Sequence, residues 1–210
     1  MNSQFYTTTV VKATAPSFSE SGFFISPTQL NLIVTKLNCI EIYLINEYGL
    51  LLLSETELNG KIEIMKVFRP KNKNTDLVFV VTAEYNVMIL EFIQASDKIE
   101  IITKGHCNVF DHFGVATESM AKIDPNAKIV MVKLFEHIFK IIPLDKEGEL
   151  EVYSITTEEA NIRDFSFLYG FINPTILIIH ENSKGRNIKI KEIIVDFITC
   201  FEVISFLISH

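Results

Sequence analysis

The sequence has no tryptophan, few glycines and few cysteines, and each scarcity excludes a class of protein. The eight glycines lie at least nine residues apart. This spacing excludes the dinucleotide-binding fingerprint, the Walker A loop and the nucleophile elbow, because each needs closely spaced glycines. The three cysteines, Cys39, Cys107 and Cys200, form no C-x-x-C pair. We therefore expect neither a disulfide framework nor a zinc ribbon, and we expect three reduced thiols.

Basic residues are also scarce, since 19 Lys and Arg face 26 Asp and Glu, for a net charge of -7. Binding of nucleic acid through the general charge of the surface is therefore disfavoured, because contacts with phosphates need a basic patch. The N-terminal segment lacks the basic stretch and the long apolar run of a secretory signal. With 48% hydrophobic and 21% charged residues among 210, the chain has the composition of one folded domain, or of two small ones.

Short apolar runs rich in Ile, Val and Phe occur along almost the whole chain, separated by Asn, Gly, Asp and Lys. Such runs are typical of β-strands. Similar hairpins recur every 47 to 51 residues, and we expect four residues to occupy matching positions on second strands: Val34, Val81, Val132 and Ile179. Four strands in such a repeat make one blade of a β-propeller.

The sequence therefore predicts an all-β, WD40-like β-propeller fragment of about three and a half to four four-stranded blades in an incomplete ring. The Trp-Asp dipeptide typical of WD40 repeats is absent, because the chain has no tryptophan. The blades are expected at residues 18–58, 61–104, 108–156 and 161–195, with the last blade incomplete. The stretch 147–156 is expected to be one strand of the third blade.

Five strings in the chain resemble a known scaffold family, and they occur in the order GKIEIMKVFRP, DLVFVVTAEYNVMILEF, IEIITKGHCNVFD, IFKIIPLD and FSFLYGFINPTI. They are similar to the N-terminal part of the first propeller in the family of the large subunit of the UV-damaged-DNA-binding complex. That family consists of triple-propeller adaptors of cullin-four ubiquitin ligases. Propeller scaffolds of pre-mRNA splicing and 3′-end processing share the architecture.

The resemblance implies a partial N-terminal propeller over residues 1–192, in which strand 5–11 would complete a missing last blade. It implies a scaffold without catalytic, cofactor-binding or metal-binding residues, located in the nucleus and also in the cytoplasm. Its partners would be substrate-receptor proteins of the ligase and the remaining propellers of a full-length parent. Damaged DNA would be reached only through a receptor subunit, in nucleotide-excision repair. The alternatives are a splicing or 3′-end-processing scaffold and, from another class, a propeller enzyme.

The segment 193–210 is a divergent apolar tail, because the resemblance ends near Glu192. Its apolar part includes Asp196 and Glu202 and is shorter than the ~20 residues of a membrane span, so we expect no membrane contact. A continued strand pair, a divergent helix and non-homologous sequence could each explain the tail, and the abrupt end favours the third. With the last blade missing, we expect the isolated chain to aggregate or to need another chain, and removal of residues 1–12 to cost little stability.

The string GHCNVFDH (105–112) brings several polar side chains close together in sequence. A zinc site would need three or four converging ligands, and an inter-blade loop that contacts a partner protein is the preferred interpretation. The resemblance places partner binding on this face, and the candidate contact residues are His106, Asn108, Asp111, His112 and Glu118. We interpret the loop KNKNTD (71–76) and the pair Glu158-Glu159 as solvated turns.

Overall fold

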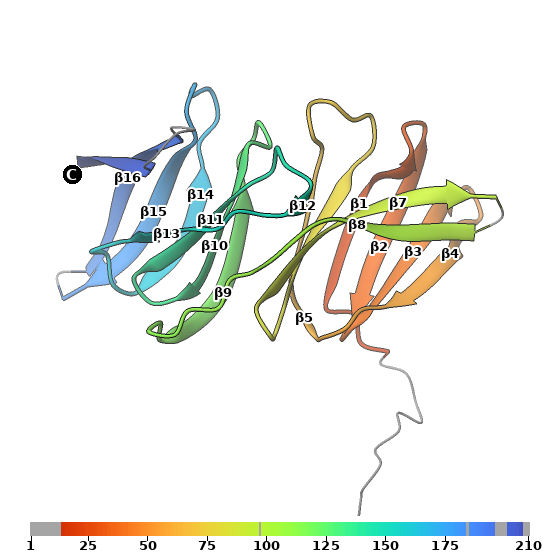
Figure 1. Cartoon of the computed structure of the whole chain (residues 1–210), viewed down its shortest axis with the longest axis horizontal. Coiled ribbons are helices and arrows are strands. Elements are labelled where there is room, and N and C mark those ends of the chain that lie inside the picture. The colour runs from red at the N-terminus through yellow and green to blue at the C-terminus, as the bar shows by residue number, and fades with distance from the viewer. Residues whose placement is uncertain (1–13, 97, 184, 196–200, 208–210) are drawn as a thin grey trace, which may run out of the picture.

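The computed structural model describes residues 14–96, 98–183, 185–195 and 201–207, and within them every regular element is a β-strand. Figure 1 shows the strands as separate twisted sheets, placed side by side in chain order. The described part of the chain contains no helix long and apolar enough to cross a membrane. The predicted all-β propeller fragment is confirmed. The expected strand 5–11 lies outside the described residues.

Each sheet is one blade, built almost entirely from antiparallel neighbours in sequence. The first blade contains β1 (Phe18–Ser26), β2 (Gln29–Lys36), β3 (Cys39–Asn46) and β4 (Gly49–Glu57). The second contains β5 (Ile62–Phe68), β6 (Leu77–Thr82), β7 (Asn86–Ala95) and β8 (Lys98–Asn108). The third contains β9 (Ala116–Ile123), β10 (Ile129–Phe135), β11 (Ile138–Pro143) and β13 (Tyr153–Thr156). The fourth contains β14 (Ile162–Phe167), β15 (Thr175–Asn182), β16 (Gly185–Val195) and β17 (Phe201–Leu207).

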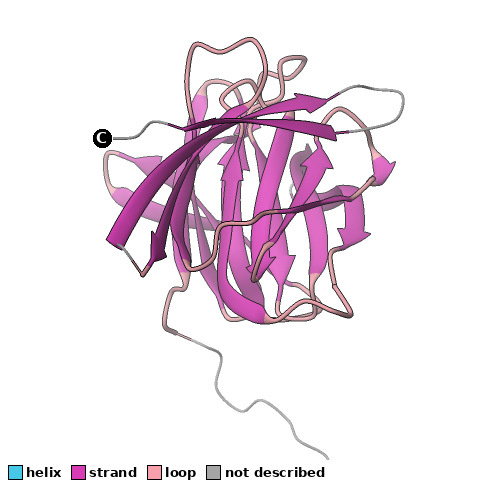
Figure 2. Ribbon diagram, turned by 90° about the vertical axis from the view of Figure 1, so that its left-hand side faces the viewer, coloured by secondary structure: helices cyan, strands magenta, loops and turns pink. Residues whose placement is uncertain are grey.

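The fourth blade has four strands, because β17 pairs with β16 from Lys189–Leu207 to Val195–Phe201. The tail therefore continues the sheet as a strand pair, which is one of the three explanations that the sequence left open. Within the described residues the first and the fourth blade lie at opposite ends of an open row (Figure 1), and Figure 2 looks along this row from the side of the fourth blade.

The stretch 147–156 does not form one strand. Instead β12 (Gly148–Glu149) pairs in parallel with β8 and adds a fifth strand to the second blade, while β13 stays in the third blade. Leu150 is buried beside Gly105, where an added Cβ would lie 2.8 Å from Cδ2 of Leu150. A glycine at 105 thus lets the chain cross between two blades at close range.

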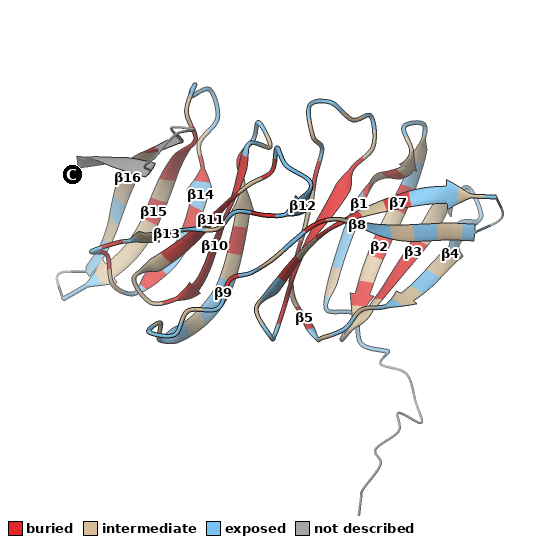
Figure 3. Ribbon diagram, in the orientation of Figure 1, coloured by how far each residue is buried: buried red, intermediate tan, exposed pale blue. Residues whose placement is uncertain are grey.

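Among the described residues, the hydrophobic core forms three layers, one between each pair of neighbouring blades. Figure 3 shows that buried residues are concentrated on the inner strands. In β6 every residue is buried, with Phe79 and Val81 packed toward the third blade and Val78 and Val80 toward the first. A strand covered on both faces reads as a continuous apolar run, and this explains why the sequence does not alternate there.

The four matching residues lie on the second strands β2, β6, β10 and β15, as the repeat predicts. Their side chains alternate in direction, however. Val81 and Val132 share the layer between blades two and three, whereas Val34 and Ile179 are half-buried and belong to no described core layer. Along one strand, a shift of a single residue moves a side chain to the opposite face. The repeat is therefore correct for the strands but one residue out of register.

Candidate protein-interaction surfaces

The five candidate contact residues do not all lie in one loop. His106 and Asn108 lie at the end of β8, which extends to residue 108, and Glu118 lies on β9. Only Asp111 and His112 lie in the connection between the second and third blades, which spans 109–115. The third blade therefore starts at residue 116, eight residues after the predicted start at 108.

Asn108 and Asp111 hold the inter-blade connection in place. The Asn108 side chain donates to Oδ1 of Asn86 (2.9 Å) and accepts from the backbone N–H of Phe110 (2.9 Å). Asp111 accepts from the backbone N–H of Phe113 (3.0 Å) through Oδ1 and from the buried ammonium of Lys140 (2.6 Å) through Oδ2. Hydrogen bonds from Lys140 and from the Phe113 backbone lower the pKa of Asp111. These two side chains are engaged within the protein, so their first role is to shape the connection.

The exposed part of this surface is aromatic. Phe113 is 96% exposed, and the half-exposed Phe110 lies between Tyr85, at 5.4 Å between ring centroids, and His112, at 5.0 Å. His106, His112 and Glu118 are exposed on the same surface. Sequence reasoning missed the phenylalanines, although two apolar rings within a polar connection, FDHF, are an unusual pattern for a solvated turn.

The neighbouring residues His106 and Cys107 do not converge as metal ligands would. They point to opposite faces of β8, and Cys107 packs against the core layer between blades two and three. Burial raises the pKa of the Cys107 thiol to about 12, so this group stays protonated and is a poor ligand. Among the described residues, potential ligand atoms gather instead at Cys39, Glu41 and Glu55 on the first blade.

That group of three is already satisfied by protein contacts. Glu41 accepts hydrogen bonds from Lys36 (2.7 Å) and from the Tyr43 hydroxyl (2.6 Å). Burial would raise the pKa of Glu41, but these two hydrogen bonds outweigh burial and lower it. Cys39 lies 3.6 Å from a carboxylate oxygen of Glu55. The arrangement stabilises the face of the first blade that turns away from the second.

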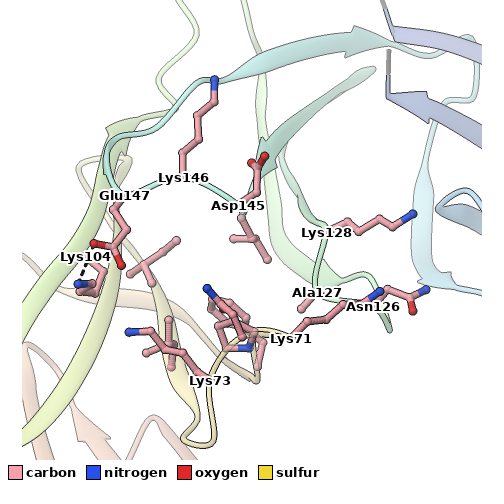
Figure 4. Close-up of a pocket in the computed structure, with 15 residues that line it drawn as sticks. Lys71, Lys73, Lys104, Asn126, Ala127, Lys128, Asp145, Lys146 and Glu147 are labelled. Carbon is pink, nitrogen blue, oxygen red and sulfur yellow. Dashed lines mark ion pairs between the residues drawn. The ribbon is translucent and has the colours of Figure 1, made fainter. Parts of the chain in front are cut away.

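A lysine-rich cavity of about 280 Å³ lies between the second and third blades, at the ends of β5 and β9 (Figure 4). Its walls come from the connections 69–76, 124–128 and 144–147. Its floor is the end of the core layer, with four buried apolar residues: Phe68, Leu77, Ile89 and Leu144. Five lysines surround the opening: Lys71, Lys73, Lys104, Lys128 and Lys146. We call this site the lysine cavity.

The lysine cavity is positive in a chain of negative net charge. Asp145 and Glu147 are the two carboxylates among its lining residues, so the lining carries a net charge of +3. Lys104 binds Glu147 at 2.8 Å, and the hydrogen bond to that carboxylate raises the pKa of Lys104. Lys73 and Lys104 also share Glu91. Within the described chain, Lys71 has no ion-pair partner.

The loop 71–76 is therefore only partly the solvated turn that its composition suggested. Asp76, its last residue, is buried and forms two hydrogen bonds with Arg69, at 2.8 and 2.9 Å. The same carboxylate accepts from the backbone N–H of Phe23 (2.7 Å), which ties the loop to the first blade. Asp76 thus fixes the base of the loop from which Lys71 and Lys73 reach the cavity. The sequence alone did not indicate this anchor.

Comparison with known proteins agrees with this architecture. The model of the RSE1/DDB1/CPSF1 first beta-propeller family matches residues 18–202, ten residues beyond the expected end of the resemblance at 192. DNA damage-binding protein 1 of Drosophila melanogaster is 42% identical over 194 residues, which are 91% of this chain and 17% of the relative. DNA damage-binding protein 1 of Oryza sativa subsp. japonica is 34% identical over 192 residues, which are 90% of this chain and 17% of the relative. DNA damage-binding protein 1b of Arabidopsis thaliana is 36% identical over 192 residues, which are 90% of this chain and 18% of the relative.

The chain thus spans less than a fifth of the length of these relatives. It matches the family model over most of its own length, from the first strand of the first blade into β17. The resemblance inferred from the five strings is confirmed. The chain belongs to the family of the RSE1/DDB1/CPSF1 first beta-propeller.

Proposed function

We propose that this chain is part of a non-catalytic protein-interaction scaffold, the adaptor of a cullin-type ubiquitin ligase that serves damaged-DNA recognition and nucleotide-excision repair. The observation that carries the proposal is the 42% identity over 91% of the chain to a protein named DNA damage-binding protein 1. Relatives named for DNA damage binding favour this function over the splicing and 3′-end-processing scaffolds of the same architecture. The proposed location is the nucleus and also the cytoplasm.

In this proposal the partners are substrate-receptor proteins and the other propellers of a longer parent. The chain meets DNA only through a receptor subunit, in keeping with its net charge of -7. We place one partner contact on the aromatic surface around Phe113, flanked by His106, His112 and Glu118. An exposed aromatic ring beside polar groups is typical of interface anchors, because the ring buries a large area at low conformational cost.

The test is affinity capture of partners from nuclear extract by the tagged chain, followed by mass spectrometry. Recovery of repair receptors supports the proposal. Recovery of splicing or 3′-end-processing factors supports the alternative scaffold, and recovery of neither class contradicts both.

Two variants locate the contact. Phe113→Asp should lose the captured partners, because it places a charge where an apolar anchor is needed. Tyr48→Asp is the matched control, since Tyr48 is 97% exposed in the turn between β3 and β4, in the first blade. If both variants retain the same partners, the contact lies elsewhere on the propeller.

A further inference from the structure

We propose that the lysine cavity binds an acidic peptide segment of a partner protein, with one apolar side chain of that segment inserted between the second and third blades. The inference rests on the proposed scaffold function and adds the chemistry of one partner site. The aromatic surface around Phe113 plays no part in it, because the connection 109–115 lies beyond the opposite ends of β8 and β9.

The charges favour an anionic partner. Figure 4 shows Lys71 and Lys73 on one wall of the cavity. Lys104 and Glu147 lie together on a second wall, where they form an ion pair. Lys128 extends away from the centre and donates to the backbone carbonyl of Ile172 at 3.1 Å. Lys73 and Lys104 share the carboxylates of Glu91 and Glu147, and Lys146 is paired with Glu151 at 2.6 Å. Lys128 and Lys71 have no ion pair in the described chain, and since Lys128 is held by the Ile172 carbonyl, Lys71 is the ammonium left to bind a partner. An incoming carboxylate would satisfy it.

The apolar floor favours a peptide over a free anion. Phe68, Leu77 and Ile89 form this floor, and a phosphate ion would gain nothing from contact with them. The cavity, at about 280 Å³, is just below the ~300–1,000 Å³ of typical small-molecule sites. Its size suits one bulky side chain, with the peptide backbone lying across the lysine rim.

The chain already provides an internal example of this chemistry. The connection 144–147 inserts Leu144 into the floor and, three residues later, gives the Glu147 carboxylate to Lys104. Glu147 is 62% exposed, so a partner carboxylate can replace it on Lys104 without opening the core. The occupied part of the cavity thus shows the combination, an apolar anchor near a carboxylate, that a partner segment would extend toward Lys71.

The test uses the full 210-residue chain, immobilised at low density through an N-terminal tag so that copies stay apart. The probe is a fluorescein-labelled eight-residue peptide of glutamate and aspartate with one central leucine. We expect saturable binding that weakens with salt, since the contacts are exposed charges. Replacing the peptide leucine by alanine should weaken binding about tenfold, as loss of a buried anchor does.

Three variants of the chain make the test specific. Lys71→Glu should weaken binding about five- to tenfold, because it removes one attraction and adds a repulsion at a partly solvated site. Lys98→Glu is the matched control: Lys98 is the exposed first residue of β8 and does not line the cavity, so its replacement should change binding less than about twofold. Glu147→Gln should strengthen binding about two- to fivefold, because it removes the internal competitor for Lys104, and local damage to the fold would not produce this gain.

Equal binding by wild type and Lys71→Glu, or no gain with Glu147→Gln, would overturn the inference. A single-stranded oligonucleotide that displaces the peptide at lower concentration would also overturn it and assign the cavity to nucleic acid. Capture of repair receptors from extract without peptide binding would reject the cavity but leave the proposed function standing. Peptide binding without capture of receptors would reject the proposed function but leave the peptide site in the cavity standing.

Discussion

The buried carboxylate of Glu159 gives the sharpest test of what holds the fourth blade to the third. Glu159 follows β13 and is almost fully buried, where it accepts hydrogen bonds from Lys189, Lys191 and Thr157. Lys191, at 2.6 Å, is itself buried on β16. The pair Glu158-Glu159 is thus not simply a solvated turn, because only Glu158 is exposed. We expect Glu159→Gln to destabilise the chain.

The magnitude follows from the pKa. Burial would raise the pKa of Glu159, but hydrogen bonds from Lys189, Lys191 and Thr157 outweigh burial and lower it from 4.5 to about 2. At ~1.4 kcal/mol for each tenfold change, this difference corresponds to about 3 kcal/mol of stability at neutral pH. Removing one partner of a buried ion pair typically costs a similar amount, about 3–5 kcal/mol. For a chain of this size the melting temperature should fall by roughly 10 °C.

The pH dependence distinguishes this cause from general damage. Because the pKa is lower in the folded state, the stabilisation is fully present above pH 4.5 and is lost as the pH falls toward 2. Urea unfolding followed by circular dichroism, at one fixed protein concentration, should therefore show a gap between wild type and Glu159→Gln that is largest at pH 7. The gap should close between pH 4.5 and about pH 2.

The adjacent residue supplies the control. Glu158→Gln changes an exposed carboxylate and should alter the free energy of unfolding by less than about 0.5 kcal/mol at every pH. A loss below about 1 kcal/mol for Glu159→Gln would refute the reasoning. A gap that stays constant from neutral pH down to about pH 3 would also refute it, since the stabilisation could not then come from the ionised carboxylate.

Three further predictions concern thiols, packing and association. Thiol titration of the unfolded chain without reductant should find all three cysteines as free thiols. In the folded chain Cys107 should react more slowly than Cys39, because burial raises the pKa of the Cys107 thiol to about 12, and equal reaction rates would contradict this. Gly114→Ala should cost about 1–3 kcal/mol in urea unfolding, since its Cβ would lie 2.6 Å from ring atoms of Phe135, and an unchanged midpoint would show that the loop yields freely. The isolated chain should self-associate in sedimentation velocity, and a monodisperse wild-type monomer would contradict this. Leu50→Lys should reduce the association, because Leu50 is 56% exposed on the uncovered face of the first blade.

The sequence by itself determined the class of fold and the division into blades. Strands such as β6 and β10 are continuous apolar runs bounded by polar turns, and such runs fold locally as strands wherever both faces are covered. The recurrence of the hairpins sufficed to place Val81 and Val132 on second strands. The matched strings sufficed to identify the family, because family membership depends on the order of residues along the chain.

Only the tertiary structure decided which faces those residues use and which side chains meet. A shift of one residue along a strand reverses the face of a side chain, so an approximate repeat could not predict that Val34 is only half-buried whereas Val132 lies fully in the core. The division of 147–156 between two blades depends on the close approach of Leu150 to Gly105, a contact between residues 45 positions apart in sequence.

The charged groups show the same limit most clearly. Asp111 is an apparent contact residue in the sequence, yet it binds buried Lys140 from the next blade. Lys71 lies in the loop after β5 and Lys104 on β8, yet both line the same cavity. Electrostatic interactions depend on distance and burial, and neither quantity exists in a sequence until the blades pack against one another.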